Sequence, residues 1–157
     1  MRGLLLAAAA GAGSYYWYTF WDSQIGPDDP APTESTFGLM TWPESLDIPG
    51  QKKASFHAML GASSRVGQSR LAGDLGQILG WQEHLHAIAF VDDATHYTVA
   101  VWHSLTELQE EVEVELPTPL DSTSWNRYDQ SGNLIESGTA SPVPMVATGP
   151  VSYLTFK

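Results

Sequence analysis

The chain contains no cysteine and few basic residues, and both shortages narrow what it can be. Without cysteine there are no disulfides, no thiolate zinc sites and no Cys nucleophile, and the redox compartment stays open. Seven Lys and Arg residues against 18 Asp and Glu residues give a formal net charge of −11. This acidity would repel a polyanion, so we expect neither a nucleic acid nor an anionic membrane surface as a partner.

Long apolar runs are missing too, because no segment reaches the roughly 20 apolar residues of a membrane-spanning helix. At 157 residues the chain is too short for a complete (β/α)₈ barrel of about 250 residues, but it suits a fragment plus one small domain. Apolar residues make up 43% of the chain, which is enough for a packed core. The sequence has no Gly-rich phosphate loop and no Ser nucleophile elbow, and we expect no cofactor.

Residues 1–14, MRGLLLAAAAGAGS, allow two interpretations. One positive charge, a short apolar run and small residues outline a secretory signal peptide. Leu and Ala are also the strongest helix formers, so the same run can be the buried face of an ordinary helix. We favour the helix, because the strand that follows would need a helix beside it, and we leave the signal peptide open.

The next segments predict one strand and one helix joined by a long loop. Tyr15–Trp21 is apolar on both alternating faces, which is typical of a strand buried on both sides in a parallel sheet. Residues 26–36 are rich in Pro, Gly and Asp and must form a loop. Gln51–Gly67 carries apolar residues at helical spacing. Residues 1–67 therefore look like one strand–helix unit of a barrel or a doubly wound sheet.

From Leu85 onward the apolar period changes to two, which predicts antiparallel strands. In residues 111–116, EVEVEL, the apolar side chains face one way and the glutamates the other, so that sheet has one solvated face. We interpret residues 68–80 as a junction and residues 81–157 as a β-sandwich, which gives an α+β fold class. The predicted strands are His86–Val91, His96–His103, Glu111–Leu116, Trp125–Tyr128, Asn133–Glu136, Pro144–Ala147 and Val151–Phe156.

Three stretches, in this order, resemble the C-terminal part of a known family. They are YWYTFWD at 16–22, FGLMTW at 37–42 followed by KKASFHAML at 52–60, and a tail with TVAVWHS at 98–104, YDQSGN at 128–133 and GPVSYLTF at 149–156. The family is that of the retaining glycoside hydrolases with a (β/α)₈ barrel and an accessory β-sandwich. The resemblance implies that 16–22 is the eighth barrel strand and 52–60 the last helix, and it favours a secreted protein.

The resemblance also implies where sugar would bind and where catalysis would not occur. Retaining enzymes use two carboxyl groups about 5–5.5 Å apart, and the family carries them as glutamates on strands four and seven, which would precede Met1. Trp21 matches the position of a sugar-stacking Trp at the end of strand eight, Asp22 could hydrogen-bond a hydroxyl, and Trp42 is a second candidate. Glu34 and Glu44 we interpret as solvated loop acids, because Asp and Glu are mostly exposed.

The histidines suggest a different site. His84 and His86 are two residues apart, so on a strand they point to the same face, where His96 or His103 of the neighbouring strand could join them as metal ligands. Exposed strand histidines are common, and no third ligand is fixed by the spacing. We therefore expect no metal, with His84, His86 and His103 as the residues to examine.

Three functions remain open on the sequence alone: a glycosidase portion that is inactive alone, a stand-alone sandwich that binds carbohydrate or a protein partner, and a small His-site metalloprotein. The first has a physical consequence. A strand that is apolar on both faces, without its neighbours in the chain, leaves open hydrogen-bonding edges and a large apolar surface. We therefore expect self-association, or a partner chain that covers residues 4–21.

Overall fold

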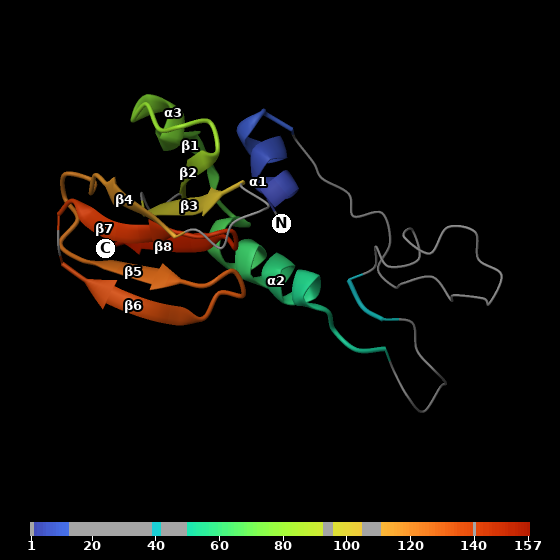
Figure 1. Cartoon of the computed structure of the whole chain (residues 1–157). Helices are drawn as coiled ribbons and strands as arrows, with labels where there is room; N and C mark the ends of the chain where they lie inside the picture. The colour runs from blue at the N-terminus through green and yellow to red at the C-terminus, as the bar shows by residue number, and fades with distance from the viewer. Residues whose placement is uncertain (1, 13–38, 42–49, 93–95, 105–110, 140) are drawn as a thin grey trace.

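The computed structural model describes residues 2–12, 39–41, 50–92, 96–104, 111–139 and 141–157. These residues form an α+β structure made mostly of antiparallel strands (Figure 1). None of the helices found there is long and apolar enough to cross a membrane. In chain order the elements are α1 (Arg2–Ala9), α2 (Ala54–Val66), β1 (Arg70–Asp74), α3 (Leu75–Ile78), β2 (Leu85–Val91), β3 (Tyr97–His103), β4 (Val112–Leu116), β5 (Trp125–Tyr128), β6 (Leu134–Gly138), β7 (Val143–Ala147) and β8 (Ser152–Phe156).

The main sheet has six strands in the order β1-β2-β3-β8-β5-β6, and each neighbouring pair is antiparallel. Consecutive strands pair as hairpins in β2–β3 and β5–β6, whereas β8 is inserted between β3 and β5. β8 therefore joins two hairpins that lie far apart in the sequence.

A two-stranded sheet, β4 with β7, packs on one face of the main sheet and completes the sandwich. In β4 the glutamates Glu113 and Glu115 are exposed, while Val112 and Val114 pack against the core and Leu116 lies in it. The predicted division of this strand into an apolar and a solvated face is confirmed. The core between the two sheets consists of Ala87, Ala89, Val99, Val101, Leu116, Trp125, Val143, Met145, Ala147, Leu154 and Phe156.

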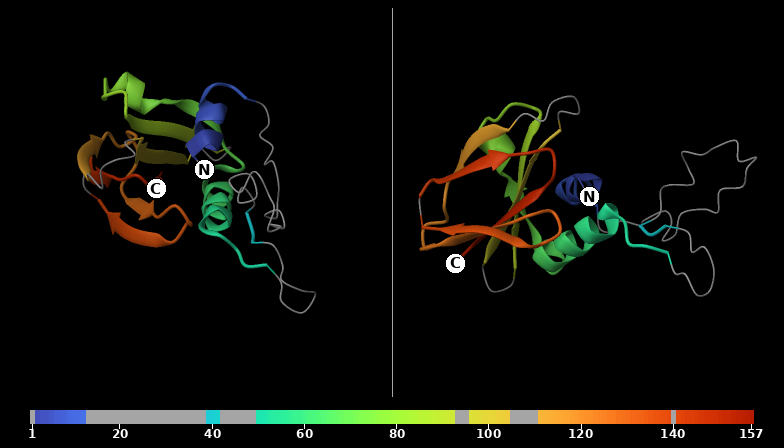
Figure 2. Two further views of the ribbon diagram at one scale, coloured as in Figure 1. Left: turned by 45° about the vertical axis from the view of Figure 1, so that its right-hand side comes forward. Right: turned by 60° about the horizontal axis from the view of Figure 1, so that its bottom comes forward.

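Helices cover the opposite face of the main sheet, so its middle strands are buried on both sides. Leu5 of α1 and Ala62 of α2 are buried there, and in both views of Figure 2 the two helices lie close together. Neighbouring side chains along a strand point to opposite faces of the sheet, so the strand residues beneath the helices alternate with those that face the sandwich core. The residues beneath the helices are Ile88, Phe90, Ala100, Trp102 and Tyr153, with Val151 just before β8.

All seven strands and the helix over 51–67 that the sequence predicts are present, with ends shifted by a few residues at most. The segment 68–80, which we interpreted as a junction, instead supplies β1 and α3, and β1 pairs with β2. Its sequence RLAGD hides the strand, because Gly and charged residues are depleted in strands and an edge strand needs little burial. The predicted strand Tyr15–Trp21 lies outside the described residues, so the barrel unit stays a prediction.

Candidate functional site

The three residues that the resemblance assigns to sugar binding, Trp21, Asp22 and Trp42, lie outside the described residues. The loop acids Glu34 and Glu44 lie outside them as well. The contacts of these side chains therefore remain predictions. The histidines of the possible metal site, in contrast, all lie in described segments.

The histidines do not converge on one point. His86 is opposite Trp102 in the β2–β3 ladder and stacks on its ring, with 4.8 Å between the ring centroids and 22° between the planes. His103 is opposite Leu85, so it points to the other face of the sheet, where it is buried. His96 instead contacts Asp92, with 3.2 Å between Nδ1 and Oδ2.

The structure therefore offers no support for the metalloprotein. Within the described ranges, no group of three or more His, Cys, Asp or Glu side chains is arranged to hold a metal ion. Burial lowers the pKa of His86; the nearby Asp74 raises it, and Arg2 and His84 lower it again. A His whose pKa is lowered is neutral at pH 7, which suits stacking against the indole of Trp102. The spacing of two residues predicted a shared face but could not show that His103 lies on the opposite one.

α2 is joined to the β5–β6 hairpin by a close backbone contact. A side chain at Gly61 would overlap the carbonyl oxygen of Gln130, and a Cβ at Gly132 would lie 3.3 Å from the Cα of Gly61. Gly132 also has a φ of +86°, a conformation that glycine adopts without strain. Only glycine at both positions lets the helix approach the turn this closely.

Polar contacts hold the same joint. Arg65 donates from Nη2 to the carbonyl of Gly132 at 2.8 Å, and its guanidinium carbon lies 3.5 Å from the centroid of the Tyr128 ring. Asp129 accepts hydrogen bonds from the backbones of Ser131 and Asn133 and from the Asn133 amide. Burial would raise the pKa of Asp129, but these hydrogen bonds outweigh it and lower the pKa below the usual range. The motif YDQSGN is therefore a turn that docks onto α2.

The outward sides of α1 and α2 expose large apolar side chains. Leu6 is 43% exposed, Met59 38% and Leu60 51%. We call these three residues the helix surface. Single exposed apolar residues are ordinary, but three of them on the two helices that cover the sheet make a candidate docking face.

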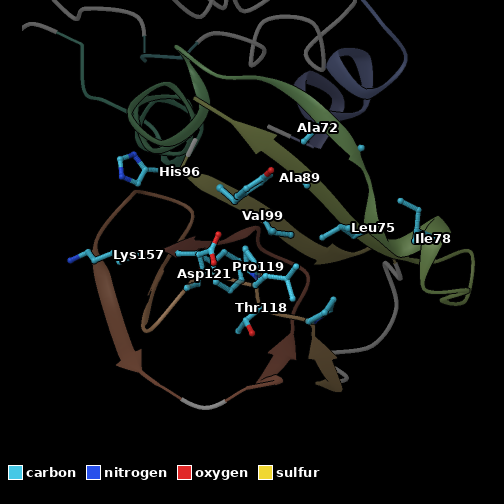
Figure 3. A pocket seen from close by; sticks show the side chains of 16 residues that line it. Ala72, Leu75, Ile78, Ala89, His96, Val99, Thr118, Pro119, Asp121 and Lys157 are labelled. Atoms are coloured by element: carbon cyan, nitrogen blue, oxygen red, sulfur yellow. The ribbon is translucent and has the colours of Figure 1, made fainter. Parts of the chain in front are cut away.

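A pocket of about 860 Å³ opens on the sandwich side of the main sheet. Figure 3 shows Ala89 and Val99 between Leu75 and Ile78 on one side and Pro119 and Asp121 on the other. Apolar residues make up most of its lining, and its volume is in the range of ligand pockets. One signal for it was visible in the sequence, the Pro-rich segment Pro117–Asp121, which cannot continue the ladder of β4. The lining also includes His96, Asp121 and Lys157.

The described residues form an antiparallel sandwich with helices on the outer face of its main sheet, and this fold has a solved counterpart. No family model and no curated protein matches the chain. A similar solved structure is a family 39 glycoside hydrolase from the gut symbiont Bacteroides cellulosilyticus WH2, with a TM-score of 0.71 and 20% sequence identity. The match covers 99% of this chain and 29% of that chain. At this identity the likeness shows the fold alone.

Proposed function

We propose that the chain is the C-terminal portion of a glycoside hydrolase, associated with carbohydrate and not catalytic with its own residues. The observation that carries this proposal is the match of 99% of the chain to only 29% of a family 39 glycoside hydrolase. The order of the motifs along the sequence supports the same assignment independently, since it does not depend on the coordinates. The two glutamates of the reaction would then come from the remaining barrel.

The helix surface is the place where that barrel would pack. Leu6, Met59 and Leu60 are exposed on the helices that cover the sheet, so they point away from the sandwich core. In the proposed protein, α2 is the last barrel helix, and its outer side would pack within the barrel wall. This accounts for apolar residues on both sides of one helix.

Trp21, Asp22 and Trp42 are the residues we propose for sugar contact. An indole ring at the carboxyl end of a barrel strand lies on the face where barrel enzymes bind substrate. The C–H face of a sugar stacks on such a ring, and a carboxylate next to it accepts hydrogen bonds from hydroxyl groups.

Replacing Trp21 tests the sugar site. In affinity electrophoresis through gels that contain soluble plant polysaccharides, we expect at least one polysaccharide to retard the chain. Trp21→Ala should weaken that binding about tenfold, because a stacking surface worth about 1.4 kcal/mol is removed.

Tyr97→Ala is the matched control, since Tyr97 is an aromatic residue 37% exposed on β3 and outside the proposed site. It should leave the retardation unchanged. Aryl glycosides should not be hydrolysed by the purified chain. If hydrolysis occurs and Glu34→Gln or Glu44→Gln abolishes it, the chain carries its own catalytic acids and the proposal is wrong.

A further inference from the structure

β4 leaves one edge of its sheet unpaired among the described residues, because its ladder partner there is β7 and the sheet has two strands. Glu115 is opposite Pro144, which has no N–H to donate. Antiparallel residues alternate between pairs that exchange hydrogen bonds and pairs that do not. Glu115 and Pro144 are therefore a pair that does not exchange hydrogen bonds. The Glu113–Val146 pair, two residues away, is of the same type.

It follows that the N–H and C=O groups of Glu113 and Glu115 point away from β7, to the open edge. A contact of Val146 agrees with this geometry. Its carbonyl accepts from Nη2 of Arg127 at 3.4 Å, so it too points away from its ladder partner.

The same contact shows which way the open edge faces. Arg127 belongs to β5, so the outer edge of β7 lies on the β5 side of the sandwich. The outer edge of β4 must then face the half of the main sheet that contains β1, β2 and β3, as Figure 1 also shows. The two-stranded sheet leaves part of this half uncovered.

The pocket lies over that uncovered half. Its floor includes Ala89 and Val99, and Pro117, the residue that follows β4, is part of its wall. A strand paired with the open edge of β4 would direct every second side chain into this apolar pocket.

The remaining side chains of such a strand, which point away from the pocket, would lie beside acidic side chains of β4. Glu113 and Glu115 are exposed on the solvated face of β4, and residues directly across a ladder lie about 4.5–5.5 Å apart at Cβ. Opposite charges at these positions stabilise the pairing and like charges weaken it. A strand that fits the open edge of β4 therefore has apolar residues in alternation with Lys or Arg.

We propose that the open edge of β4 and the adjacent pocket bind an extended peptide segment of alternating apolar and basic residues, which adds as a third strand to the β4–β7 sheet. The segment comes from outside the 157 residues of this sequence. The chain spans 29% of the solved glycoside hydrolase that it resembles, so a protein of that size has further chain to supply such a strand. Strand addition is a common mode of peptide recognition, in which backbone hydrogen bonds give affinity and alternate side-chain pockets give specificity.

A short fluorescent peptide in which Val and Lys alternate is the probe, and fluorescence anisotropy is the measurement. The control peptide has the same composition with all Val residues before all Lys residues, so its net charge is the same but its alternation is lost. We expect saturable binding of one alternating peptide per chain, and binding of the control at least about tenfold weaker. Equal binding of the two peptides would show attraction to an acidic protein alone and would overturn the proposal.

Two variants at one position separate the backbone from the charge. Glu113→Pro removes the outward N–H, which an edge strand tolerates, and should weaken the alternating peptide about tenfold. Glu113→Ala keeps that N–H and removes only the charge, so its loss should be smaller. Ala72 is an exposed residue that lines the pocket, so the larger side chain of Ala72→Trp should also weaken binding. This variant leaves β4 unchanged, so its result does not depend on whether β4 tolerates proline.

Circular dichroism and thermal melting check that each variant is folded. Binding of Glu113→Pro equal to that of Glu113→Ala, or full binding by Ala72→Trp, would overturn the proposal. Sedimentation without peptide tests a second copy of the chain as the occupant. If the chain forms a dimer that is lost in Glu113→Pro and kept in Glu113→Ala, the edge of β4 pairs with the same edge of a second copy. That result would overturn the proposal that a basic segment binds there.

Discussion

Tyr153 is the clearest case of a single side chain whose surroundings set its chemistry. It is the second residue of β8, is fully buried under the helices, and its hydroxyl has no hydrogen-bond partner among the described residues. Burial raises its pKa above the ordinary value of 10.0. An unsatisfied hydroxyl in a core costs free energy of folding, about 1–3 kcal/mol.

Tyr153→Phe should therefore raise the free energy of unfolding by about 1 kcal/mol at pH 7, because it removes the buried hydroxyl and keeps the ring. Above pH 10.0 the unfolded chain ionises at this tyrosine while the folded chain keeps it neutral, so wild-type stability falls as pH rises. The advantage of the variant should widen in that range. Urea unfolding followed by circular dichroism between neutral and alkaline pH measures both effects.

Tyr97→Phe is the matched control, because Tyr97 is 37% exposed. Its stability should equal that of the wild type at pH 7. Tyr153→Phe would be evidence against the unsatisfied hydroxyl if it were destabilising at pH 7, since that result would reveal a lost hydrogen bond.

At the scale of elements, the contact between α2 and the β5–β6 hairpin fixes how the helix lies across the sheet. Gly61 provides the space, and Arg65 holds the carbonyl of Gly132 and covers the ring of Tyr128. The joint connects the sandwich with the helix that we propose as the last barrel helix, so its rigidity would set the orientation of a barrel relative to the sandwich.

Gly61→Ala should lower the free energy of unfolding by about 1–3 kcal/mol, because the new methyl group overlaps the backbone of Gln130. The intrinsic preference of helices for Ala over Gly, about 1 kcal/mol, acts in the opposite direction and is smaller than the clash. Denaturant unfolding measures the difference.

Gly73→Ala supplies the control, since a Cβ there would meet only the Cδ1 of Ile78 at 3.8 Å. Its effect should stay within about 0.5 kcal/mol. Gly61→Ala at wild-type stability would show that helix and hairpin do not touch in solution.

Elements with a strong local period were predictable from the sequence, and those without it were not. The strand Leu85–Val91 and the helix Ala54–Val66 follow from apolar spacing alone. Arg70–Asp74 was missed because its strand character comes from pairing with β2 and not from its own residues. The Gly61 contact had a visible signal, a glycine inside a helix, but its partner turn at residues 130–132 can be known only from the fold.

For the whole molecule, the α+β class and the sandwich could be predicted from the sequence, while the strand order and the pocket could not. Nothing local in residues 152–156 says that they lie between β3 and β5. The same limit applies to the pocket, which exists because the two sheets differ in width. Trp21, Asp22 and Trp42 remain predictions of the resemblance.

The exposed apolar residues of the helix surface predict that the chain self-associates. If the helix surface packs against another surface in the whole protein, the isolated chain should form dimers or larger species in sedimentation velocity at micromolar concentration. The double variant Met59→Lys with Leu60→Lys should shift it toward monomer, because charges replace exposed apolar contacts.

Ile78→Lys with Leu79→Lys is the control, since these residues at the end of α3 are 73% and 39% exposed and belong to neither α1 nor α2. This pair adds the same charge and should leave the association unchanged. A wild-type chain that stays monomeric, or an equal effect of both pairs, would speak against the helix surface as a docking face.

The place of β8 between β3 and β5 has a consequence for biosynthesis. Until the ribosome has passed Phe156, the β2–β3 and β5–β6 hairpins have no strand to join them, and the nascent sheet cannot close. Domains otherwise begin to fold from their N-terminal side during translation. Here the nascent polypeptide has to keep its earlier hairpins from aggregating until almost the last codons of this sequence have been read.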